Sequence, residues 1–90
     1  MMYLGQLLDV LPDNELVTLR SAGHTPVVYF EESTIGFIKK GLTKEARQCS
    51  IAYMYSDVQT DSYGRATGNS YQVIEIRPNG HFIRNGDVTT

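Results

Sequence analysis

The side chains of this 90-residue chain that could act in catalysis or bind a metal ion include 10 Asp and Glu, two histidines and one cysteine. A small hydrolase would use Asp57, Asp61 and His81 for acid and base catalysis. Paired acids become catalytic where their separation is fixed or one pKa is raised, and the sequence spacing indicates neither. The histidines and Cys49 also lack the close spacing of metal ligands. We therefore expect no enzymatic activity, no metal and no cofactor, with the acid- and histidine-dependent hydrolase as the alternative.

Cys49 is the single cysteine, so no disulfide can form within the chain. It alternates with Ile51, Tyr53 and Tyr55 along a predicted strand, which favours a small buried hydrophobe over a nucleophile. A secreted protein of this size usually has paired cysteines, and the apolar run before Asp9 is short. We therefore expect a cytoplasmic protein with no export signal and no membrane anchor.

The most informative segment for function is 57–70, which is rich in Asp, Ser, Thr, Gly and Asn and is flanked by tyrosines. Tyrosine offers a large contact area at a small entropic cost, and Ser, Gly and Asn adapt their hydrogen bonds to a partner. This composition is typical of a recognition surface, although a merely mobile loop is the alternative. The candidate partner-binding residues are Tyr55, Asp57, Asp61, Tyr63, Arg65, Asn69 and Tyr71.

The overall charge is nearly balanced, because 8 Lys+Arg and 10 Asp+Glu give a formal net charge of −2. Affinity for nucleic acid depends on neutralising phosphates, so direct binding to DNA or RNA is disfavoured. The basic side chains gather in one segment, at Lys39, Lys40, Lys44 and Arg47. This segment could meet an acidic partner or phosphate, but a solvated helix face is the simpler interpretation.

Two helices are predicted from apolar spacing. Four leucines between residues 4 and 11 recur on one helical face, which predicts a helix over 3–11 that ends before Pro12. A second, short helix is predicted after a cap at Ser33 or Thr34, with apolar residues at positions 35, 38 and 42. Glycines within this second segment lower its helix propensity.

Strands are predicted where β-branched and aromatic residues alternate or cluster. They cover 16–20, 27–30, 49–56, 71–77 and 81–84. The first two are expected to form a hairpin, and the turn at 78–80 is expected to join the last two. Segment 57–70 offers almost nothing to bury and is predicted to be a long polar loop, and residues 85–90 are predicted to fray.

A chain of this length forms one modest core, so we expect a single domain over residues 1–90. The order of elements predicts an α+β fold, with a small, mainly antiparallel β-sheet of four to five strands and the N-terminal helix packed on one face. An unprotected edge strand such as Val27–Phe30 would allow a homodimer, which makes a self-associating structural protein a further alternative.

Three segments resemble small accessory proteins of bacteriophages and prophages, and the likeness extends over about half of the chain. They are Leu7–Leu19, Ile51–Tyr55 and Tyr71–Ile76. The resemblance implies a cytoplasmic protein without catalysis, and some such proteins, anti-CRISPR proteins among them, are stoichiometric inhibitors of host defence. We therefore predict a protein-binding module that inhibits a larger host protein by steric occlusion. The resemblance transfers no site residue, and 57–70 lies outside it.

Overall fold

The computed structural model describes residues 2–79, which form two α-helices, one short 3-10 helix and four β-strands. In chain order these are α1 (Leu4–Val10), β1 (Leu16–Ser21), β2 (Val28–Thr34), α2 (Ile35–Gly41), η1 (Ala46–Gln48), β3 (Ser50–Thr60) and β4 (Ala66–Arg77). The strand predicted at 81–84, the turn that ends at residue 80 and the tail at 85–90 extend outside the described residues. No described helix is long and apolar enough to cross a membrane.

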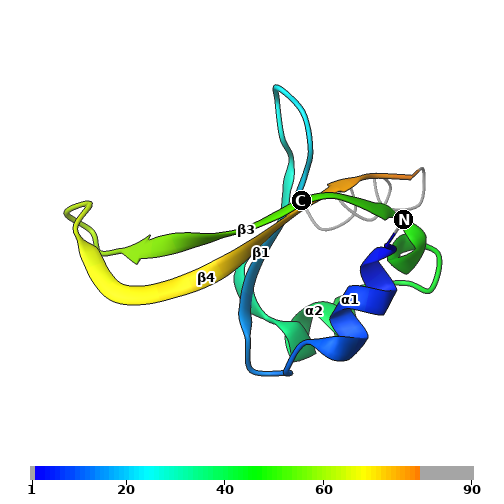
Figure 1. The fold of residues 1–90 in the computed structure, drawn as a ribbon, viewed down its shortest axis with the longest axis horizontal. Helices are drawn as coiled ribbons and strands as arrows, with labels where there is room; N and C mark the ends of the chain where they lie inside the picture. The colour runs from blue at the N-terminus through cyan, green and yellow to red at the C-terminus, as the bar shows by residue number, and fades with distance from the viewer. Residues whose placement is uncertain (1, 80–90) are drawn as a thin grey trace.

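The strands form one sheet in the order β2-β1-β4-β3 (Figure 1). β1 pairs antiparallel with β2, and β3 pairs antiparallel with β4, so the sheet contains two hairpins. The hairpins meet where β1 pairs in parallel with β4. The predicted α+β fold with a mainly antiparallel sheet is confirmed, and the central parallel pairing is the feature that the sequence did not indicate.

α1 forms as the leucine spacing predicts. Tyr3 precedes the helix in an extended conformation, and its N–H donates to Gln6 Oε1 at 2.9 Å, which satisfies a donor at the N-terminus. Leu11 returns to extended backbone immediately before Pro12, as the steric restriction of a residue before proline requires. Three of the four leucines are buried, and Leu11 is partly buried.

α2 begins after Thr34, one of the two predicted caps. The Thr34 side chain accepts a hydrogen bond from the Phe37 N–H at 3.2 Å, so one of the free N–H groups at the helix start is satisfied. Ile35 and Ile38 are fully buried, which confirms the predicted apolar face. Burial of this face compensates for the low helix propensity of its two glycines.

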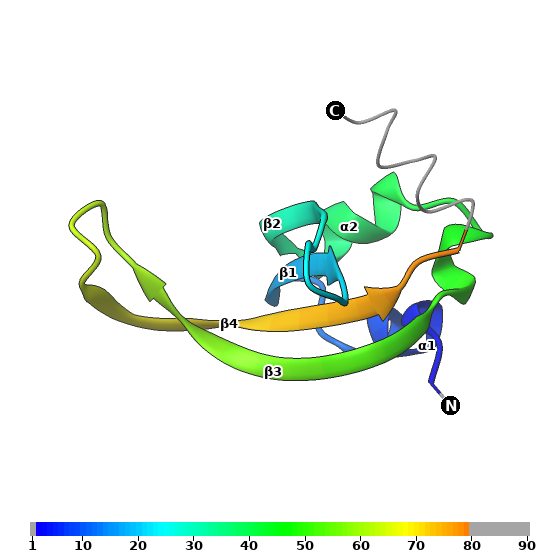
Figure 2. The same cartoon turned by 90° about the horizontal axis from the view of Figure 1, so that it is seen from above.

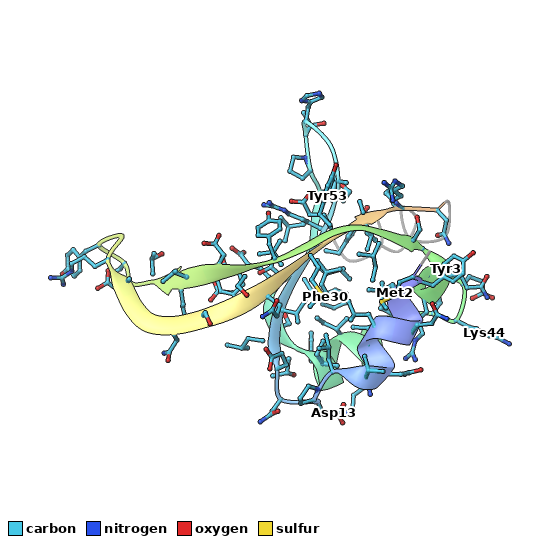
Figure 3. The ribbon with its side chains drawn as sticks, viewed as in Figure 1. Met2, Tyr3, Asp13, Phe30, Lys44 and Tyr53 are labelled. Carbon is cyan, nitrogen blue, oxygen red and sulfur yellow. The ribbon has the colours of Figure 1, made fainter. Side chains whose placement is uncertain are left out.

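The hydrophobic core lies between the two helices and one face of the sheet. The fully buried aliphatic side chains that meet there are Leu4, Leu8, Val17, Leu19, Ile35, Ile38, Ile74 and Ile76. Phe30 packs against this cluster from the same side (Figure 3). Cys49 is buried as predicted, and this burial raises the pKa of its thiol. We call the opposite side of the sheet the outer face.

The predicted long loop at 57–70 is wrong. β3 continues to Thr60 and β4 begins at Ala66, so only residues 61–65 form the turn. The two strands project beyond both helices, and the views from two directions agree on this (Figures 1 and 2). The polar side chains of this segment bury little apolar surface, which is why a loop was predicted. A strand ladder forms through backbone N–H and C=O groups, so polar residues can also belong to it.

Tyr53 does not share a face with Ile51, contrary to the alternation along this strand. Ile51 pairs with Ile76 and Tyr53 pairs with Glu75, so Ala52 is an extra residue that forms a β-bulge. The bulge reverses the side-chain alternation. Ile51 therefore contacts the core, whereas Tyr53 is 63% exposed and lies on the outer face (Figure 3).

Replacement of Leu8 tests the importance of the core. Leu8→Ala is expected to lower the free energy of unfolding by about 2–5 kcal/mol, because it removes a fully buried side chain and leaves a cavity. Val10→Ala on the same helix is the matched control, since Val10 is 74% exposed, and we expect a change within about 0.5 kcal/mol. Urea unfolding measures both values, and equal losses would contradict this packing.

Candidate protein-binding surface

All seven candidate binding residues lie on the β3–β4 hairpin, and the structure divides them into two groups. Three form the hairpin tip, which we define as residues 61–65, and they are Asp61, Tyr63 and Arg65. Three lie nearer the core on the outer face, and they are Tyr55, Asp57 and Tyr71. Asn69 lies on β4 between the groups, where its N–H donates to Thr67 Oγ1 at 3.3 Å.

The tip is an ordered turn built around Asp61. Its carboxylate Oδ1 accepts hydrogen bonds from the N–H groups of Tyr63 at 2.9 Å and Arg65 at 3.0 Å. The Asp61 N–H donates to the Arg65 carbonyl at 2.8 Å, which closes the turn between the strands. Gly64 has φ +80°, a left-handed conformation that glycine adopts without a steric penalty.

The same turn presents Tyr63 and Arg65 side by side. The guanidinium carbon of Arg65 lies 5.2 Å from the centre of the Tyr63 ring, within the range of a cation–π contact. Arg65 Nε also lies 3.4 Å from Asp61 Oδ2. Tyr63 is 81% exposed at the end of the projecting hairpin. The tip therefore displays an aromatic ring and a cation that one carboxylate holds in place.

A hydrogen-bonded triad connects three strands on the outer face. Glu75 Oε2 accepts from Arg20 Nη2 at 2.7 Å, from Arg20 Nε at 3.1 Å and from the Tyr55 hydroxyl at 2.8 Å. The Tyr55 hydroxyl in turn accepts a hydrogen bond from Arg20 Nη2. Because Arg20, Tyr55 and Glu75 belong to β1, β3 and β4, the triad fixes the base of the hairpin against the centre of the sheet.

The triad shifts the pKa values of its members. Hydrogen bonds from Tyr55 and then Arg20 stabilise the carboxylate and lower the pKa of Glu75. The hydrogen bond to Glu75 raises the pKa of Tyr55, because it stabilises the protonated hydroxyl. At neutral pH the triad therefore contains an ionised Glu75 and a protonated Tyr55.

Tyr71 lies among acidic side chains on the outer face. It pairs across the hairpin with Asp57, and Glu31 and Glu32 of β2 also act on it. Desolvation first, and then these carboxylates, raise the pKa of Tyr71, so its hydroxyl stays protonated. Gln59 Nε2 donates to Glu32 Oε1 at 2.9 Å, which ties the outer half of the hairpin to β2.

Several exposed apolar side chains accompany these residues, and the sequence reasoning did not select most of them. On the hairpin they are Tyr53 at 63%, Met54 at 42%, Tyr55 at 40%, Val58 at 49% and Tyr63 at 81% exposed. All but Tyr63 belong to β3. Tyr53 and Tyr55 lie on the outer face, whereas Met54 pairs with the core residue Ile74 and lies on the opposite face. Exposed apolar side chains that share a face are a mark of interaction surfaces, so Tyr53 extends the candidate site along the outer face of β3.

The groups of the hydrolase alternative do not converge in the described part of the chain. The oxygens of Asp61 hold the turn and Arg65, and Asp57 Oδ1 accepts from the Val58 N–H at 2.8 Å. His81 lies outside the described residues. Within residues 2–79, no three His, Cys, Asp or Glu side chains are grouped to hold a metal ion.

The basic segment is partly structural. Lys39 Nζ forms an ion pair with Asp13 Oδ1 at 3.0 Å, and Arg47 Nη2 donates to the Lys39 carbonyl at 2.6 Å. These contacts connect α2 to the α1–β1 turn and to η1. Lys40 and Lys44 are exposed beside shallow depressions, and Lys44 extends away from the body of the protein (Figure 3).

Arg20 and Glu75 are the site residues that sequence reasoning missed. Each lies in a correctly predicted strand, and 55 positions separate them in the chain. They become neighbours through the parallel β1–β4 register. The one feature of the sequence that could have indicated Glu75 is the alternation along β4, which places Glu75 on the same face as the candidate residue Tyr71.

No protein-family model matches the chain, and no curated protein or solved structure is significantly similar to it.

The lowered pKa of Glu75 predicts a pH dependence of stability. A carboxyl whose pKa is lower in the folded state stabilises the fold above its ordinary pKa of about 4.3, and this contribution is lost as the pH falls through the lowered value. The free energy of unfolding is therefore expected to fall more steeply below about pH 5 in the wild type than in Glu75→Gln. Urea unfolding at several pH values measures the two slopes.

Two tyrosine variants show whether the triad is the cause. Tyr55→Phe removes the hydroxyl that donates to Glu75, so we expect a slope between those of the wild type and Glu75→Gln. Tyr63→Phe makes the same change at the exposed tip and should keep the wild-type slope. Identical pH profiles for the wild type and Glu75→Gln would contradict the described role of the triad.

Proposed function

We propose that this protein is a non-enzymatic protein-binding module whose recognition element is the β3–β4 hairpin. The observation that carries this proposal is the tip, where Asp61 orders a turn that displays Tyr63 beside Arg65. Tyrosine and arginine are the residue types that, with tryptophan, contribute most to binding at protein interfaces. The tip projects beyond the helices, so a partner can reach it from several sides (Figure 2).

Order in the free state supports the same proposal. A binding segment that is already fixed loses less conformational entropy when it meets its partner. The Asp61 hydrogen bonds fix the tip, and the Arg20–Tyr55–Glu75 triad fixes the base of the hairpin. The outer face between them carries Tyr71 and Asp57, which extend the contact surface toward the sheet.

We further propose that binding inhibits the partner by steric occlusion. The support for an inhibitor of a host defence protein is the resemblance of Leu7–Leu19, Ile51–Tyr55 and Tyr71–Ile76 to small phage accessory proteins. The protein would then act in the host cytoplasm, a reducing compartment that suits one buried, unpaired Cys49. Such an inhibitor binds its target one for one, whereas an enzyme would act at a small fraction of the target concentration.

Alanine variants at the tip test the proposal. The full chain, immobilised and exposed to host lysate, identifies partners by mass spectrometry, and calorimetric titration of a purified partner gives the stoichiometry and affinity. We expect a one-to-one complex. Tyr63→Ala and Arg65→Ala are each expected to weaken it by about 2 kcal/mol or more, because each removes a contact at the centre of the interface.

The matched control is Val27→Ala on the other projecting segment, the exposed β1–β2 connection. It removes an exposed apolar side chain outside the β3–β4 hairpin and should leave the affinity unchanged. All three variants should keep the wild-type melting temperature, since none of the replaced side chains belongs to the core. A complex whose affinity neither tip variant changes would refute the proposed role of the hairpin tip.

A further inference from the structure

β3 lies at one edge of the sheet, and only its beginning is covered within the described residues. The Ile51 N–H donates to the Met2 carbonyl at 3.0 Å, and the Leu4 N–H donates to the Cys49 carbonyl at 2.8 Å. Tyr3 pairs with Ser50 as an isolated bridge, so the N-terminal segment covers the first residues of this edge (Figure 3). From Met54 onward, no strand among residues 2–79 pairs with the edge of β3 that points away from β4.

The backbone groups that face this open edge can be assigned. The Val58 N–H donates to its neighbour Asp57 Oδ1, so it points away from the β3–β4 ladder. Because donors alternate along a strand, the N–H groups of Met54 and Ser56 point the same way. Met54, Ser56 and Val58 therefore face the edge in succession, and an added strand would replace Asp57 Oδ1 as the partner of the Val58 N–H.

Two irregularities limit the open edge to a short, regular stretch. The β3–β4 register shifts between Ile51 and Tyr53 and again between Val58 and Thr60, which leaves residues 53–58 as an uninterrupted ladder. β3 contains no lysine, arginine or proline, and Asp57 is its one charged residue. A regular edge of this kind is a template for an added strand.

The opposite edge, which the alternative of a self-associating protein would use, is less suited to pairing. β2 also lies at an edge, but the two register shifts of its pairing with β1 divide that ladder into short runs, whereas those of β3 leave residues 53–58 uninterrupted. Glu32 has φ +44°, which interrupts the extended backbone. Adjacent Glu31 and Glu32 would repel the same residues of a second copy. The β3 edge is therefore better suited than Val27–Phe30 to form the contact of a homodimer.

We propose that the β3 edge from Met54 to Val58 docks antiparallel on the same edge of a second copy, with a two-fold axis at Ser56. In this register Met54 lies opposite Val58 of the second copy, and Val58 lies opposite Met54. Both side chains are exposed in the single chain, at 42% and 49%. Tyr55 lies opposite Asp57, which sets a large amphipathic ring beside a carboxylate.

Neighbouring registers are less complementary. A shift toward the tip that centres the axis on Asp57 places two like charges opposite each other, which destabilises a strand pair. A shift the other way, centred on Tyr55, places Met54 opposite Ser56 and Val58 opposite Ala52, which belongs to the bulge. Only the Ser56-centred register matches both apolar side chains within the regular stretch. This self-complementarity is the reason for assigning the edge to a second copy.

The resulting dimer is compatible with the proposed function but does not depend on it. Pairing would join two four-stranded sheets into one sheet of eight strands. The two hairpin tips would point in opposite directions along the strands. Tyr63 and Arg65 lie outside the paired stretch. A contact of about five residues per strand is smaller than a standard interface, so we expect weak association that becomes visible at high protein concentration.

Paired charge substitutions test the contact and its register. In M54K/V58E, each introduced lysine lies opposite an introduced glutamate of the second copy, so the dimer should persist. In M54K/V58K, like charges lie opposite each other, and the dissociation constant should rise by about tenfold or more. M54E/V58E introduces charges of the opposite sign but keeps the repulsion between like charges, so it should weaken the dimer similarly. All three variants lose the same apolar side chains.

Sedimentation velocity from about 10 µM to about 1 mM measures the association, and circular dichroism verifies the fold of each variant. The expected result is concentration-dependent dimer formation by the wild type and M54K/V58E, with little by the two repulsive variants. A wild type that stays monomeric up to about 1 mM would overturn the proposal, as would equal association of all three variants. Neither outcome would bear on the tip, because no partner is present in this experiment.

Discussion

The parallel pairing of β1 with β4 is the interaction on which the rest of the structure depends. It joins two hairpins that would each be marginally stable alone into one four-stranded sheet. Its register aligns Leu19 with Ile74, so the helices find a continuous apolar face. The same register aligns Arg20 with Glu75, so the outer face acquires its charged triad. Core and candidate surface are therefore two sides of a single strand pairing.

The unequal lengths of the strands explain why this small protein has an extended surface. β1 has 6 residues, whereas β3 and β4 have 11 and 12, so β1 pairs with β4 only at residues 72–76 and the rest of the second hairpin extends past it. The buried core cluster does not extend to the projecting part of the β3–β4 hairpin, so it cannot stabilise that part directly. Local contacts do so instead, through the Asp61 turn at one end and the Arg20–Tyr55–Glu75 triad at the other. Polar contacts thus hold the surface in place where apolar burial ends.

The candidate residues were predictable by type but not by arrangement. The composition of 57–70 includes the Asp and Gly of the tip, whose turn preferences act within a few residues. The same composition led to a wrong loop prediction, because the backbone hydrogen bonds of a strand ladder do not require apolar side chains. The Ala52 bulge places Tyr53 on the face opposite Ile51, and nothing in the alternation of these residues indicates such an insertion.

The sequence by itself determined the helices, most strand positions and the α+β class. Leucine spacing, the Thr34 cap and the restriction before Pro12 act between residues that are close along the chain. The three-dimensional arrangement decided that β1 and β4 are parallel neighbours, that Arg20 meets Glu75, and that β3 is an outermost strand of the sheet formed by residues 2–79. The physical reason is that pairing between distant strands depends on the combined burial of the whole core, which no local pattern contains.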